Sequence, residues 1–397
     1  MKKMIFGLVA VLVLFGAVVT YTHWDNAAAP AAVAATPAAT AAPAATPEVH
    51  SLDYDAIRAL YPADTAAITL GDEVMNWDMY ADWLRTNGLQ YEDYFRQMGA
   101  YYGVAADWTG SMGDGTGKTY AQGLLQETNE TLASFLAIKD MAKSKGLTLD
   151  EEAQKSLDPE TMAHQILGEN ATVADLAAEL EKTSRMTVRA FRFYSEALDY
   201  YTLLSQELYG AQGEKLPEAD IVADLEEHGY LSAHHILFMT IDPMTGKNLE
   251  EAEVAKKLEQ ANELVKELRA IEDHDALLKR FKELKEQYCE DTGKQAYPDG
   301  YTFTPGTMVT VFEDTLKAQQ PFEVSDPVQS DYGFHIIMRL PLTGDSLLFS
   351  PQGTPQTARV SVAQERITKD LDDYYTAHAP VYAEGLEELD LTEYIVD

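Results

Sequence analysis

Two histidines stand in short apolar stretches of this chain and are its first candidates for chemistry. His235 lies in "AHHIL" and His335 lies in "YGFHII". Short apolar runs rich in β-branched residues predict buried strands. A buried imidazole is costly without a partner, and a lone histidine in such a strand is more often a hydrogen-bonded core residue than a site residue. The residues alone leave both interpretations open.

A metal site is a third interpretation, because His234 adds another imidazole next to His235. Successive side chains of a strand point to opposite faces, so His234 should face away from His235. A site made of His234, His235 and His335 is therefore disfavoured. Cys289 is the single cysteine of the sequence, which excludes an intrachain disulfide and a thiolate cluster. We expect neither a metal nor another cofactor.

The elements that must position these side chains follow from hydrophobic periodicity. An apolar run begins at Leu231, two amphipathic helices follow up to Tyr288, and after a Gly/Pro-rich loop the stretch "GTMVTVFED" predicts a short helix before a last strand. Met308 and Phe312 are four residues apart, which places both on one face of that helix. This order predicts a compact α+β domain over residues 230–343, with helices covering its sheet.

Four segments of this region, in order, resemble the parvulin (PpiC, or rotamase) family of peptidyl-prolyl isomerases, in particular the exported PrsA- and SurA-type foldases. The segments are "AHHIL", "YCED", "GTMVTVFED" and "VSDPVQSDYGFHII". The resemblance implies an antiparallel-rich sheet whose adjacent central strands carry histidines that can hydrogen-bond each other. It also implies two groups of site residues: His235, Asp291 and His335 as catalytic residues, and Met308, Phe312 and Tyr332 as substrate-binding residues.

The implied reaction needs no cofactor. Rotation about an X-Pro bond is slow because amide resonance resists twisting, so a catalyst must bind the twisted amide better than the planar forms. Met308 and Phe312 would form an apolar slot for the proline ring. The histidines would shape the polar floor, and Asp291 would act on the charge around the twisted carbonyl.

One departure from the family's pattern concerns the loop "YPDGY", Tyr297 to Tyr301, where relatives carry Gly-Gly-Asp-Leu-Gly. Pro298 cannot follow every backbone path that glycine allows. Gly300 stands at the position of the leucine, which would remove one apolar wall of the proline pocket. This loop favours the alternative function, a non-catalytic holdase chaperone that binds unfolded secreted chains.

The region 52–229 is predicted to be helical and, by looser resemblance, a chaperone-like domain. Its segment "GDEVMNWDMYADWL" resembles the first helix of such domains, and the aromatic-rich "YEDYFRQMGAYYGVAADW" belongs either to the core or to a groove for apolar peptides. Residues 344–397 are expected to form a helical tail, packed on this region in one arrangement, with a loosely held acidic end.

The N-terminus predicts export. Lys2 and Lys3 precede a long apolar run, so residues 1–25 are expected to be a signal or membrane anchor and the Ala/Pro-rich residues 26–51 a linker. The domains would then lie on the extracytoplasmic side, or be secreted after cleavage. The formal net charge of -35 argues against nucleic acid as a partner. The expected partners are unfolded or partly folded secreted polypeptides with X-Pro bonds, and the membrane through the N-terminal segment.

Overall fold

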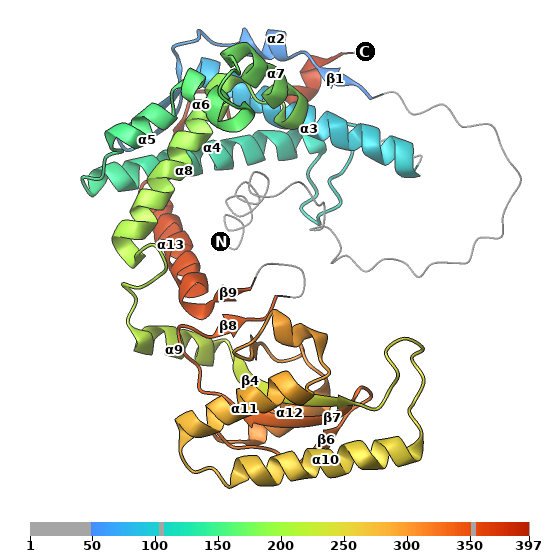
Figure 1. Ribbon diagram of the computed structural model, residues 1–397. Coiled ribbons are helices and arrows are strands. Elements are labelled where there is room, and N and C mark those ends of the chain that lie inside the picture. Colours follow the sequence, from blue (N-terminus) through green and yellow to red (C-terminus); the bar gives the residue numbers. More distant parts are fainter. Residues whose placement is uncertain (1–48, 103–106, 351–354, 397) are drawn as a thin grey trace, which may run out of the picture. The chain divides into compact units, whose positions relative to one another are not determined.

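The computed structural model describes residues 49–102, 107–350 and 355–396, which form two compact units (Figure 1). Of the described residues, one unit contains those up to Leu204 and those from Thr368 onward, and the other contains those from Ser205 to Ile367. The chain leaves the first unit within helix α8 (Val188–Tyr209) and returns within α13 (Ala358–Ala377).

The predicted anchor, residues 1–25, and nearly all of the predicted linker, residues 26–51, lie outside the described residues. Within the described part, no helix combines the length and apolar character needed to cross a membrane.

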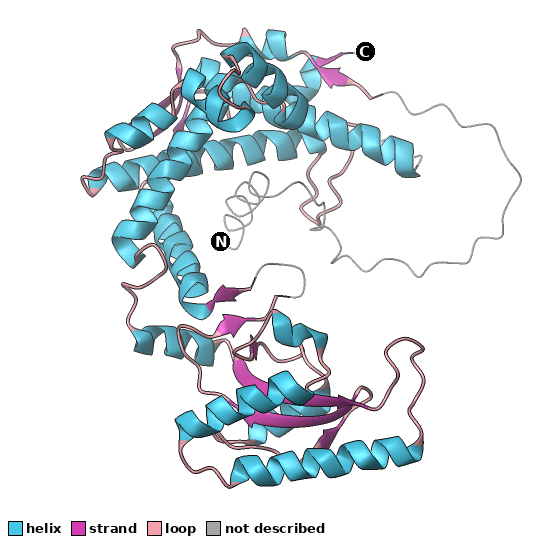
Figure 2. Cartoon of the chain, viewed as in Figure 1, coloured by secondary structure: helices cyan, strands magenta, loops and turns pink. Residues whose placement is uncertain are grey.

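Helices dominate the first unit (Figure 2). The long helix α4 begins with a capping box in which Thr119 and Gln122 each satisfy a backbone N–H of the other, and α7 and α8 are separated at Arg185, whose φ is +60°. The remaining bounds are α2 (Tyr54–Arg58), α3 (Trp77–Tyr102), α4 (Tyr120–Ser144), α5 (Glu151–Ser156), α6 (Pro159–Leu167) and α7 (Val173–Ser184).

The first unit also contains strands, which corrects the expectation of a purely helical region. The segment "GDEVMNWDMYADWL" is not one helix: Gly71 adopts a φ of +56° in a turn, and β3 (Glu73–Asn76) pairs with β2 (Ala66–Leu70) before α3 begins. The positive φ that glycine tolerates closes the hairpin and delays the helix.

The acidic C-terminal end is well packed, contrary to the expectation of a loosely held tail. β10 (Val381–Tyr382) pairs with β2, and β11 (Ile395–Val396) pairs with β1 (Ser51–Leu52). Leu386 and Leu391 are fully buried. Burial of these leucines and the two strand pairings outweigh the charge of the segment.

Aromatic side chains fill much of the core of the first unit. Phe95 and Trp108 are fully buried and meet edge to face, with ring centroids 5.1 Å apart. The core interpretation of "YEDYFRQMGAYYGVAADW" therefore holds for these two residues, whereas Tyr101 is 86% exposed. Edge-to-face pairs of this kind add to the stability gained from burial alone.

The second unit is built on a six-stranded sheet with helices against it. Its neighbouring strands are antiparallel except β5 and β8, and their order is β6 (Val328–Gln329), β7 (Gly333–Arg339), β4 (Leu231–Met239), β5 (Tyr301–Phe303), β8 (Leu347–Leu348) and β9 (Gln356–Thr357). Its helices are α9 (Glu218–Glu227), α10 (Glu251–Arg269), α11 (His274–Tyr288) and α12 (Thr310–Ala318). The chain is thus a mixed helix and sheet protein, as predicted.

The central strands β4 and β7 bury both of their faces. Ile236 and Ile336 pack with the apolar residues of α10 and α11, whereas Ala233 and Ile337 pack with Phe312 from α12. This division follows from strand alternation.

Gly333 provides a test of this pairing. Its φ is +149°, and an added Cβ would lie 2.0 Å from the carbonyl oxygen of Phe238 on β4. Gly333→Ala should lower the free energy of unfolding by about 2–4 kcal/mol, because the clash involves backbone. Hydrogen-deuterium exchange should show faster exchange in β4 and β7.

Gly306→Ala is the matched control, since Gly306 also has a positive φ but has no atom within 4 Å of an added Cβ. Its cost should stay near 1 kcal/mol. Equal destabilisation by the two variants would contradict the assigned β4–β7 register.

Candidate active site

The register of β4 and β7 places two histidines on the same face of the sheet. His235 is opposite Ile337 and His335 is opposite Leu237, so the two imidazoles are diagonal neighbours. Their ring centroids are 5.5 Å apart and nearly perpendicular. The side chains of His235 and His335 are both buried. The two strands therefore place two polar side chains, His235 and His335, on one face of an otherwise apolar sheet. We call this pair the polar floor of the site.

Asp291 joins this floor from the short 3-10 helix η1 (Thr292–Gln295), which it caps. Its Oδ2 lies 3.1 Å from His235 Nε2 and accepts a hydrogen bond from the Tyr301 hydroxyl at 2.6 Å, while its Oδ1 accepts from the Gly293 N–H at 3.0 Å. Its side chain remains 24% exposed, compared with 9% for His235. Asp291 is thus the charged group of this floor that is open to an incoming ligand.

The two histidines do not share the hydrogen bond that the resemblance implies. His335 Nε2 lies 2.7 Å from the Ser330 hydroxyl, and His235 Nε2 is engaged with Asp291. The Nδ1 atoms of both rings are buried and have no hydrogen-bond partner among the described residues. Buried polar atoms without partners are rare in proteins and typical of functional sites.

The aromatic rings of Phe312 and Tyr301 pack against the histidines and form the apolar wall of the site. Phe312 is 2% exposed, and its ring centroid lies 5.4 Å from that of His235 and 5.7 Å from that of His335. The Tyr301 ring stacks on His235 at 5.4 Å. The site therefore combines an apolar wall with the polar floor, as a binding pocket requires.

Met308 does not share a helix face with Phe312, contrary to the prediction. Helix α12 begins at Thr310, and Met308 lies in the loop before it. The Glu313 carboxylate accepts hydrogen bonds from the N–H groups of Gly306 and Met308 and holds this loop in place. Met308 still packs, partly buried, against the cluster that contains Phe312.

Tyr332 lies in the turn before β7 and its side chain is 52% exposed. Its backbone connects this turn to β4, since its carbonyl accepts a hydrogen bond from the Thr240 N–H at 3.0 Å. None of the contacts found among the described residues brings its ring to the histidines.

Gly300 stands at a position of "YPDGY" where this backbone requires glycine. Its φ is +104°, and an added Cβ would lie 2.7 Å from the Ala233 carbonyl oxygen on β4. A side chain there would collide with the sheet. The Tyr297 ring instead packs against Tyr301, with centroids 4.8 Å apart, and the buried Lys285 ammonium donates to the Tyr297 carbonyl at 2.7 Å.

The pKa values of the two histidines of the site are shifted in opposite directions. Burial lowers the pKa of His235, but its interactions with Asp291 and Cys289 together outweigh burial and raise this pKa above its usual value. Although burial of Asp291 would raise its pKa, the hydrogen bonds from His235 and Tyr301 lower it overall. Burial, with the neighbouring His235 charge, lowers the pKa of His335 to about 4. Protonation is thus favoured at His235, beside the Asp291 carboxylate, and disfavoured at His335.

His234 lies on the opposite face of β4, as strand alternation predicts. It is fully buried and stacks on Phe281 of α11 with centroids 5.7 Å apart. Burial, with the nearby Lys285 charge, lowers the pKa of His234 to about 3. The three imidazoles therefore do not converge on one point.

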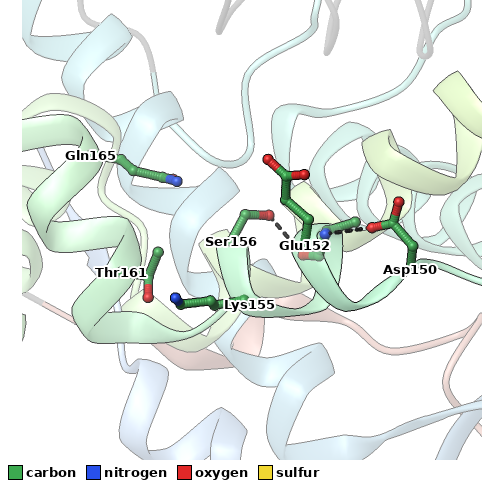
Figure 3. Close-up of a pocket in the computed structure, with 7 residues that line it drawn as sticks. Asp150, Glu152, Lys155, Ser156, Thr161 and Gln165 are labelled. Carbon is green, nitrogen blue, oxygen red and sulfur yellow. Dashed lines mark hydrogen bonds between the residues drawn. The ribbon is translucent and has the colours of Figure 1, made fainter.

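A separate hollow of about 540 Å³ lies in the first unit between α5 and α6 (Figure 3). Two of the polar groups around it are bonded to the backbone: the Asp150 carboxylate accepts from the Ala153 N–H, and the Ser156 hydroxyl donates to the Ala153 carbonyl. These are helix-capping and intrahelical bonds. They do not form a cluster suited to catalysis.

Sequence reasoning missed two residues of the site. Tyr301 was considered only as the end of the departing loop, although a tyrosine opening a buried strand needs a partner for its hydroxyl. Ser330 stands in the turn "SDYG", where serine is common for local backbone bonding, so its contact with His335 had no separate signal.

Comparison with known proteins adds an independent observation. Residues 235–340 match the family model described as a PPIC-type PPIase (rotamase) domain. Foldase protein PrsA 1 of Bacillus cereus is 50% identical over 60 residues, which cover 15% of this chain and 21% of that protein. Foldase protein PrsA of Oceanobacillus iheyensis is 31% identical over 141 residues, 34% of this chain and 38% of that protein.

Among solved structures, the foldase protein PrsA of Lactococcus lactis matches at 14% identity and a TM-score of 0.29, covering 82% of this chain and 98% of that one. The segments aligned with the curated relatives span less than two fifths of those relatives' length. The family match is therefore a property of one segment, residues 235–340, which contains His235, Asp291 and His335 and is similar to PPIC-type PPIase domains.

Proposed function

We propose that this protein is a peptidyl-prolyl cis-trans isomerase and a folding chaperone for exported proteins. The isomerase activity would reside in the second unit, and unfolded secreted polypeptides with X-Pro bonds would be its substrates. The single observation that carries this proposal is the ionised Asp291 carboxylate, fixed by Tyr301, Gly293 and His235 beside an apolar wall.

The geometry supports catalysis by shape and charge, without a covalent step. When an X-Pro amide twists, its resonance is lost and the charge on carbonyl and nitrogen is redistributed. A carboxylate already held in place costs no reorganisation when that change occurs. Asp291 would act on the carbonyl, while Phe312 and Met308 would hold the proline ring.

The histidines would act as positioning groups in this mechanism. His235 Nε2 holds the carboxylate, and His335 stays neutral under Phe312.

The alternative is a holdase that binds unfolded secreted chains without isomerising them. The Tyr297 ring favours it, since this bulky side chain fills the space beside Tyr301 where relatives carry glycine. In both functions the protein would act outside the cytoplasm, held to the membrane by the N-terminal segment or released from it.

Asp291→Asn tests the charge of the site at constant shape. The loss of a preorganised charge should lower kcat/KM for an X-Pro peptide by about 10- to 100-fold. A protease-coupled isomerisation assay measures this change, and circular dichroism checks the fold.

Asp345→Asn is the matched control, because Asp345 also carries a carboxylate in the second unit, but its side chain is 87% exposed and faces Arg359 rather than the histidines. It should leave kcat/KM unchanged. A wild-type rate at background level, with aggregation of a client still suppressed, would support the holdase instead.

The opposite pKa shifts of the two histidines predict different titrations. His335 should remain neutral down to about pH 4, whereas His235 should stay protonated above its ordinary pKa of about 6.5. Imidazole resonances in NMR, assigned with His235→Asn and His335→Asn variants, would measure both. Identical titration of the two rings would contradict the assigned charge states.

These shifts also determine how stability depends on pH. The raised pKa of His235 contributes stability that is fully present below about pH 6.5 and is lost as the pH rises through that raised pKa. The neutral His335 behaves in the opposite way: its contribution is present above about pH 6.5 and is lost as the pH falls towards its lowered pKa. The lowered pKa of Asp291 contributes stability that is present above its ordinary pKa of about 3.9 and is lost as the pH falls.

A further inference from the structure

A groove in the first unit lies outside the proposed active site. It has a volume of about 940 Å³. One wall is a face of α4, and the other is formed by the chain that follows α13. Both walls belong to the same compact unit.

The α4 wall is a continuous stripe of the helix. Gln122, Gln126 and Glu130 recur every four residues and Leu125 is three residues after Gln122, which places them along one face. The Gln126 amide donates to the Glu130 carboxylate at 2.5 Å and fixes its orientation. Glu130 therefore stands at a defined position in this wall.

Two tyrosines come from the opposite side. Tyr375 lies on α13 and Tyr382 on β10, and both are half-buried. Burial raises the pKa of Tyr375, and the charges of Glu130 and Glu387 add to the rise. Carboxylates from both walls, Glu130 and Glu387, therefore raise the pKa of the same tyrosine hydroxyl.

The groove is strongly acidic. Its charged side chains are four carboxylates and one ammonium: Glu130, Glu387, Glu388, Asp390 and Lys118. Within the part of the chain that the structure describes, neither Glu387 nor Glu388 forms an ion pair. Negative charge thus surrounds tyrosine faces, an arrangement that attracts cations.

We propose that this groove binds lysine- and arginine-containing segments of unfolded polypeptides. The aliphatic stems of these side chains would lie on Tyr375, Tyr382 and Leu125, and their charged ends would reach Glu130 and Glu387. The proposal rests on the chaperone part of the proposed function and assigns that function a client chemistry.

Charge complementarity favours a client over the chain's own linker. The segment from Ala27 to Pro47 consists of Ala, Pro, Thr and one Val, and it contains no lysine or arginine. It therefore lacks the charge that the groove would select.

The test uses the full chain and two labelled peptides of arginine, leucine and alanine, without proline, so that the isomerase site has no proline to bind. In one peptide every arginine is replaced by neutral citrulline. Fluorescence anisotropy should show the arginine peptide binding more tightly, with an affinity that falls as salt is added. Glu130→Gln combined with Glu387→Gln should weaken it by about 3- to 10-fold, since each exposed charge pair contributes little.

Glu160→Gln combined with Glu169→Gln is the matched control. Both residues are exposed, belong to the first unit and do not line the groove, so this variant has the same net charge. It should leave the affinity unchanged. Equal binding of the two peptides, or equal weakening by the two double variants, would overturn the proposal, because only a diffuse negative field would then be at work.

A variant without residues 27–47 tests whether the linker, rather than a client peptide, occupies the groove. Unchanged affinity for the arginine peptide is expected, and a large gain would show that the linker occupies the groove. Isomerase activity and suppression of client aggregation are measured on the same preparations. If the arginine peptide binds while both of these are absent, the proposed function fails and the groove assignment stands.

Discussion

The second unit depends on one partly buried group, the Asp291 carboxylate, and on the three hydrogen bonds that it accepts from Tyr301, Gly293 and His235. Removing most of a carboxylate from water is costly unless several donors compensate it. Each donor comes from a different element: a sheet strand, a 3-10 helix and a central strand. The position of Asp291 therefore requires all three elements to be in register.

This constraint explains features around it that have no direct contact with the charge. Gly300 allows the loop to pass close to β4 just before Tyr301, and the buried Lys285 satisfies two loop carbonyls, of Tyr297 and Pro298. Both hold the start of β5, and β5 in turn aims the Tyr301 hydroxyl. The loop "YPDGY", which departs from the family's pattern, thus supports the start of β5.

Much of this arrangement was predictable from local pattern. Strand parity separates His234 from His235, and helical periodicity gives α10 and α11. The loop position of Met308 was not predictable, because its conformation depends on two backbone bonds to Glu313. The contacts of Ser330 and Tyr301 also depend on pairing between segments distant in sequence. The β2–β3 hairpin was missed because "EVMNW" suits a helix as well as a strand.

The chain's two crossings between units, within α8 and α13, affect the order in which it can fold. β1 at the start of the described chain pairs with β11 at its end, so the first unit closes only after nearly all residues are available. The second unit is one continuous stretch and carries no such delay. Closing a loop of this length costs entropy and slows folding. During vectorial emergence of the polypeptide, the inserted unit would therefore be native while the surrounding unit still lacks its final strands.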